Sequence, residues 1–73
     1  MIDGKKLKRL RTKRGLSYRE AAAYVYGRTG VQIHATTIQH LEDRDDLEPR
    51  PETLAALASA YEVGVSDITR VTP

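Results

Sequence analysis

Residues 24–42 read YVYGRTGVQIHATTIQHLE, and this stretch decides the fold. In its second half, small and polar side chains surround two aliphatic residues, Ile38 and Leu41, which lie one helical turn apart. This spacing predicts an amphipathic helix with Ile38 and Leu41 facing the core. In the first half, Gly27 and Gly30 interrupt the preceding helical pattern. The stretch therefore predicts the end of one helix, a glycine-containing connection, and the start of the next helix.

The helix before this connection has a distinct start. Ser17 and Glu20 have the spacing of a capping box, in which each side chain bonds the backbone N–H of the other residue. Such a cap stabilises a helix by about 1 kcal/mol. The expected buried stripe of this helix is Ala21, Ala22 and Val25, with either Tyr24 or Tyr26 at its margin.

Helical periodicity extends over nearly the whole chain, and no alternation of apolar and polar residues lasts long enough to predict a sheet. Pro51 suits the first position of a later helix. The sequence therefore predicts one compact all-α domain over residues 1–73. Its five expected helices run from about Gly4 to Arg14, from Ser17 towards Gly27, from about Ala35 to Asp43, from Pro51 onward, and briefly around Ile68.

Composition excludes several classes of protein. The 73 residues suffice for one small domain, and the chain has no cysteine for a disulfide or a thiolate metal site. No apolar run approaches the roughly 18–20 residues of a membrane span, and the N-terminus lacks the apolar region of a signal peptide. We therefore expect a cytoplasmic protein without a membrane partner.

Charge is distributed unevenly along the chain. Residues 1–30 contain nine basic and two acidic residues, a net charge of +7, whereas residues 31–73 contain three basic and eight acidic residues, a net charge of −5. This asymmetry favours an anionic partner, and nucleic acid is the first candidate. A helix that is simply solvated by its lysines would give the same pattern.

Three segments carry a resemblance to a known family: LKRLRTKRGLSYREAA, TTIQHLED and PRPETLAALASAYEVGVSDI. Together they resemble the helix-turn-helix domains of phage repressors, Cro proteins and bacterial Xre-type regulators, over roughly Leu7 to Ile68. The resemblance implies a five-helix, lambda-repressor-like domain that binds double-stranded DNA. Its third helix would enter the major groove, and its second helix would lie across the DNA backbone.

The resemblance also implies which residues touch DNA. Gln39 would read a base, because a carboxamide can bind adenine N6 and N7 together, and Thr36 could contact a thymine methyl group. Tyr18 would contact a phosphate at the start of the second helix. His34 and Thr36 could instead be N-caps, and His40 and Arg19 could instead be solvated side chains. The complete candidate set is Ser17, Tyr18, Arg19, Arg28, His34, Ala35, Thr36, Thr37, Gln39, His40 and Arg44.

Arg11 and Glu42 have a different implied role. At these positions the family places a partly buried salt bridge between the first and third helices. Such a pair would orient the third helix and would not contact DNA.

The chain departs from the family pattern at two places. Ile38 and Glu42 arrive about six positions late, which predicts a lengthened turn at Tyr26–Gln32. A longer second helix, ending in a loop over residues 27–30, is equally consistent. Arg28 could then reach a phosphate, or the extra residues could form a surface loop that costs little entropy.

The second departure is the acidic loop Asp43–Glu48, which phosphates would repel. It is expected either to stay away from DNA or to contact a protein.

The sequence therefore predicts a sequence-specific DNA-binding transcriptional regulator of prokaryotic or phage origin. The alternatives are a protein-interaction module such as an antirepressor or assembly adaptor, and a DNA-binding antitoxin or recombination accessory protein. No enzyme activity, cofactor, metal or small-molecule ligand is expected. His34 and His40 do not share a helix face, and Asp43, Asp45 and Asp46 lack the spacing of an EF-hand loop. A homodimer on a two-fold operator would use the C-terminal region, with Tyr61, Val63, Val65 and Val71.

Overall fold

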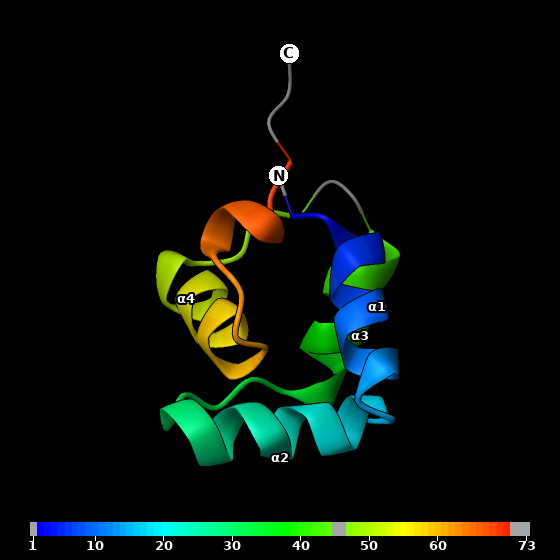
Figure 1. Cartoon of the computed structure of the whole chain (residues 1–73), viewed down its shortest axis with the longest axis vertical. Helices are drawn as coiled ribbons and strands as arrows, with labels where there is room; N and C mark the ends of the chain where they lie inside the picture. Colours follow the sequence, from blue (N-terminus) through cyan, green and yellow to red (C-terminus); the bar gives the residue numbers. More distant parts are fainter. Residues whose placement is uncertain (1, 45–46, 71–73) are drawn as a thin grey trace.

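The computed structural model describes residues 2–44 and 47–70, and these form four α-helices (Figure 1). Helix α1 spans Gly4–Lys13, α2 spans Tyr18–Thr29, α3 spans Ala35–Asp43 and α4 spans Pro51–Ala60. The all-α prediction is confirmed for the described residues, where the nearest approach to a strand is one isolated bridge between Ile2 and Thr69. That bridge lies at the end of the molecule opposite α2 (Figure 1).

The fifth predicted helix is wrong. Residues Val65–Asp67 form only a single 3-10 turn, η1, in which the Asp67 N–H bonds the Gly64 carbonyl at 3.0 Å and the Ile68 N–H bonds the Val65 carbonyl at 3.1 Å. This turn nevertheless places Ile68 in the core, where 0% of its surface is exposed.

Local signals set the starts of α1 and α2. The Asp3 carboxylate caps α1 by accepting the Lys6 N–H at 3.1 Å. At α2 the predicted capping box is complete: the Ser17 hydroxyl accepts the Glu20 N–H at 3.1 Å, and the Glu20 carboxylate accepts the Ser17 N–H at 2.9 Å. Pro51 occupies the first turn of α4, as predicted.

Helix α2 is longer than the glycines suggested, and this corrects the predicted position of the insertion. The helix continues through Gly27 and ends at Gly30, which takes the left-handed conformation at φ 75°. The connection to α3 is therefore the five residues 30–34, close to the usual three or four of a helix-turn-helix. Most of the extra residues lengthen α2, which is nearer to the second alternative above.

Tertiary contacts explain why Gly27 does not end the helix. A glycine inside a helix costs about 1 kcal/mol relative to alanine. The last turn of α2 is held by the Arg28–Glu62 ion pair at 2.9 Å and by Tyr24, whose ring stacks on Tyr61 at 6.4 Å between centroids. These partners follow α4, so the local sequence around Gly27 does not reveal them.

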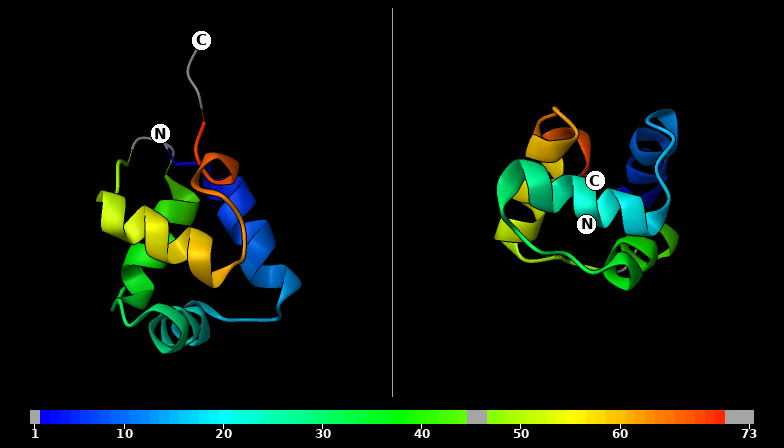
Figure 2. Two further views of the ribbon diagram at one scale, coloured as in Figure 1. Left: turned by 60° about the vertical axis from the view of Figure 1, so that its left-hand side comes forward. Right: turned by 90° about the horizontal axis from the view of Figure 1, so that it is seen from below.

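The core lies where the four helices meet. Figure 2 shows α2 across one end of the molecule, with α1 and α3 at its N-terminal half and α4 at its C-terminal half. Ile33, in the connection, is 5% exposed and closes the core between α2 and α3. The buried hydrophobic residues are Ile2, Leu7, Ala21, Val25, Ile33, Ile38, Leu41, Ala56, Leu57, Ala58, Ala60, Tyr61 and Ile68.

Candidate nucleic-acid interface

Helix α3 has one buried and one exposed face. Ile38, Leu41 and Glu42 are buried and fix its orientation. At 100° per residue, the opposite side carries Thr36, Gln39, His40 and Asp43, all of which are exposed. The structure thus brings the predicted base-reading residues Thr36, Gln39 and His40 together on one outward stripe. Thr37 is also exposed, but it lies on a flank of α3 beside Leu47 and Arg50.

The N-terminus of α3 settles the capping alternatives. His34 is the N-cap residue, but its side chain makes no capping hydrogen bond. Thr36 lies inside the helix and is therefore not the cap. The exposed His34 and the half-buried Ala35 remain at the end of α3 that a helix-turn-helix directs into the groove.

Arg11 and Glu42 form a two-pronged ion pair in the centre of the domain. Arg11 Nε donates to Glu42 Oε2 at 2.7 Å, and Arg11 Nη2 donates to Glu42 Oε1 at 3.0 Å. Arg11 Nη1 also donates to the Leu16 carbonyl at 2.7 Å. The Glu42 side chain is 0% exposed, and its hydrogen bond raises the pKa of Arg11. The pair therefore joins α1, the α1–α2 connection and α3.

The start of α2 presents fewer free groups than the sequence suggested. The Tyr18 ring lies under the Arg11 guanidinium, 4.2 Å from its carbon to the ring centroid, so Tyr18 is half-buried. The Ser17 hydroxyl already accepts the Glu20 N–H within the capping box. Arg19 is exposed.

A surface depression separates α2 from the start of α3, and we call it the α2–α3 depression. It brings together the predicted residues Arg19, His34 and Ala35. It also includes Tyr26, which is 56% exposed. The sequence left open whether Tyr24 or Tyr26 edges the core; Tyr24 packs on Tyr61, whereas Tyr26 faces solvent. The α2–α3 depression is lined in full by Arg19, Ala22, Ala23, Tyr26, Gln32, Ile33, His34 and Ala35.

Arg28 does not join these residues. It is nine residues beyond Arg19, and nine residues are two and a half turns, so the two side chains lie on opposite sides of α2. Its guanidinium pairs with Glu62 and lies 5.3 Å from the Tyr24 ring centroid. Arg44 is exposed just beyond the end of α3.

A comparison with protein families decides the classification. A family model described as a helix-turn-helix domain matches residues 4–71. The chain belongs to the helix-turn-helix domain family. This agrees with the resemblance to repressor, Cro and Xre-type domains. No curated protein and no solved structure matched in the other two comparisons.

Two further expectations about this helix-turn-helix domain concern the dimer surface and the acidic loop. Tyr61 is 1% exposed, so it is not available to a dimer surface, and its place in that prediction is wrong. Val63 is half-buried, Val65 is 43% exposed, and Val71 lies outside the described residues. The acidic loop is described in part: Asp43 and Glu48 are exposed, and residues 45–46 lie outside the description.

Within residues 2–44 and 47–70, no three potential metal-ligating side chains are grouped around a possible ion. In the same part of the chain, no helix has the length and apolar character needed to cross a membrane.

Proposed function

We propose that this helix-turn-helix domain is a sequence-specific, double-stranded DNA-binding transcriptional regulator with α3 in the major groove. One observation carries the proposal: Thr36, Gln39 and His40 form an exposed polar stripe on α3. The opposite side of α3 is anchored by Ile38, Leu41 and the Glu42 ion pair. A stripe of hydrogen-bonding groups on a rigidly held helix is suited to reading base edges.

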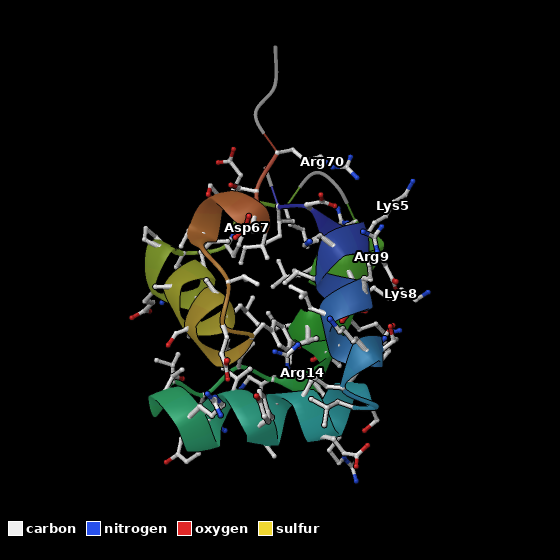
Figure 3. All side chains as sticks on the ribbon, in the orientation of Figure 1. Lys5, Lys8, Arg9, Arg14, Asp67 and Arg70 are labelled. Atoms are coloured by element: carbon white, nitrogen blue, oxygen red, sulfur yellow. The ribbon has the colours of Figure 1, made fainter. Side chains whose placement is uncertain are left out.

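Basic side chains on α1 supply the attraction to phosphates. Lys5, Lys8, Arg9 and Lys13 are exposed, and α1 contains no acidic residue. Figure 3 shows Lys5 and Lys8 extending outward from α1, whereas Arg14 turns inward, where it donates to the Tyr61 carbonyl at 2.9 Å. Exposed lysines and arginines of this kind bind DNA independently of sequence and release counterions when they do so.

Base preference would come from α3. Gln39 is an exposed residue of the stripe and is suited to adenine, which offers one donor and one acceptor to a carboxamide. Thr36 would contact a thymine methyl group, and His40 a guanine acceptor or a phosphate. Recognition of a two-fold operator by a homodimer, in the cytoplasm of a prokaryotic or phage-infected cell, completes the proposal. No enzymatic role is proposed.

A protein-interaction module is the rival function, and Asp43 favours it. This exposed carboxylate is one turn beyond His40 on the same stripe, where a phosphate would be repelled. An antitoxin or recombination accessory protein would use the same DNA contacts as a regulator.

The first experiment is a salt titration of binding to random-sequence duplex DNA, followed by selection of bound sequences from a random pool. We expect a steep loss of affinity with salt and enrichment of a short motif with two-fold symmetry. Gln39→Ala should relax the preference at one base pair, with a cost of about 1–3 kcal/mol on the selected site. If the domain does not bind duplex DNA at low salt, the rival function is favoured. If it binds without enriching a motif, sequence-specific regulation is excluded.

A further inference from the structure

The α2–α3 depression differs in charge from the other hollow beside α3. Its eight lining residues include no carboxylate and several hydrogen-bond donors, among them Arg19, Tyr26 and His34. The hollow on the opposite flank of α3 is lined in part by two carboxylates, Glu48 and Glu52, and by one arginine, Arg50. The α2–α3 depression, with an arginine and no carboxylate, is therefore the more favourable of the two for an anion.

The shape of the depression is set by small residues between two large ones. Arg19, Ala22, Ala23 and Tyr26 follow one another at helical spacing along one side of α2. The two alanines leave the space between the long side chains open. Tyr26 is 56% exposed, so a partner can reach its side chain.

We propose that the α2–α3 depression binds the phosphodiester backbone of one DNA strand, with the Arg19 guanidinium and the Tyr26 hydroxyl as donors to phosphate oxygens. This inference rests on the proposed function. When the start of α3 is in the major groove, α2 crosses the backbone, so the space between them meets a DNA strand. Arginine and tyrosine side chains are among the usual donors to phosphates.

The inference gives the extra residues a role. Tyr26 and Gln32 both lie within residues 26–32, the stretch to which the resemblance assigned about six extra residues. Because α2 continues to Thr29, Tyr26 is held on a helix, one turn beyond Ala22, and its backbone is ordered before DNA binds. Gln32 and His34, on the other wall of the depression, are further donors that the same strand would pass.

The test compares Tyr26→Phe, Arg19→Gln and the control Arg28→Gln, with fluorescence anisotropy on both random and selected duplexes at several salt concentrations. Arg28 is the matched control because it is an exposed arginine of the same helix on the opposite side. Circular dichroism melts establish that each variant is folded at the binding temperature.

Two distinct signatures are expected. Tyr26→Phe should weaken binding about tenfold on every duplex without changing the salt slope, because a neutral hydroxyl displaces no counterion. Arg19→Gln should weaken binding and also reduce the salt slope by about 1. Arg28→Gln should bind like the parent. A methylphosphonate placed at the contacted position should abolish the effect of Arg19→Gln.

Parental affinity in either Tyr26→Phe or Arg19→Gln would overturn this inference while leaving DNA binding intact. The depression would then be a site for an acidic segment of a protein. A parent that does not bind duplex DNA would overturn the proposed function itself, and this inference with it.

Discussion

Replacing Glu42 by glutamine removes a charge from the centre of the domain and keeps the side-chain shape. Arg11 stays charged in any accessible pH range and is 8% exposed, with two of its three hydrogen bonds directed at Glu42. The amide nitrogen of a glutamine would face one of these N–H groups, donor against donor. Leaving one member of a buried pair uncompensated costs about 3–5 kcal/mol.

That cost is large for this chain. At roughly 0.05–0.15 kcal/mol per residue, a domain of this length has a total stability of about 4–11 kcal/mol. Each kcal/mol corresponds to about 4–8 °C in Tm for a domain of this size, so Glu42→Gln should lower Tm by at least about 12 °C.

Urea denaturation followed by circular dichroism measures the loss, and two comparison variants define its origin. Arg11→Lys keeps the charges but loses the two-pronged geometry, so it should cost less than Glu42→Gln. The double variant Arg11→Met, Glu42→Leu removes both charges and should recover much of the stability. If Glu42→Gln melts like the parent but selects a different DNA motif, Glu42 faces the DNA and the reasoning is refuted.

Four other substitutions test individual contacts by urea denaturation. Gly4→Ala should destabilise the domain by about 1–3 kcal/mol, because the new methyl group would collide with backbone carbonyls at the end of α3. Gly27→Ala should stabilise it by about 0.5–1 kcal/mol, because no atom lies within 4 Å of the new methyl group. Equal effects of the two substitutions would contradict this packing. Ser17→Ala should cost about 1 kcal/mol. The Ser17 backbone N–H, and then its hydroxyl, lower the pKa of Glu20, and the variant loses only the hydroxyl. A small part of that cost should therefore disappear as the pH falls through the acid range, and a constant difference would show that the hydroxyl does not act on the Glu20 carboxylate. Burial raises the pKa of Tyr61 to about 12 from an ordinary 10.0, so the parent should lose stability as pH rises from 10 to 12. The Tyr61→Phe variant should not show this loss of stability at high pH. At pH 7 its stability should be close to that of the parent, because the buried hydroxyl has no hydrogen-bond partner among the described residues. A large loss of stability at pH 7 would show that the hydroxyl does have a hydrogen-bond partner.

The sequence was sufficient for features that are decided locally. The capping box at Ser17 and the proline at the start of α4 each fix a boundary with residues a few positions apart, and both are confirmed. The outward stripe on α3 was equally accessible, because the burial of Ile38 and Leu41 fixes the direction of every other side chain on a rigid helix. Whether that stripe reads DNA stays a prediction.

Features decided at long range escaped the sequence. The length of α2 depends chiefly on Tyr24 stacking on Tyr61, which lies beyond α4, and the exposed Arg28–Glu62 pair adds little. The fifth helix is a separate case: apolar spacing around Ile68 predicted a helix, but the backbone forms one 3-10 turn with hydrogen bonds from Asp67 to Gly64 and from Ile68 to Val65.

The two sides of α2 make different contacts, and this difference explains how the extended last turns of the helix are stabilised. One side carries Tyr24 and Arg28, which anchor its last turns to Tyr61 and Glu62. The Arg28–Glu62 ion pair contributes little stability, because the Arg28 side chain is 45% exposed and the Glu62 side chain is 65% exposed. Most of the stabilisation of these last turns therefore comes from the stacked rings of Tyr24 and Tyr61. With the extension fixed from that side, the other side places Tyr26 near the connection to α3, where it lines the α2–α3 depression. A longer flexible turn would have spanned the same gap, but it would have had to be ordered each time DNA bound.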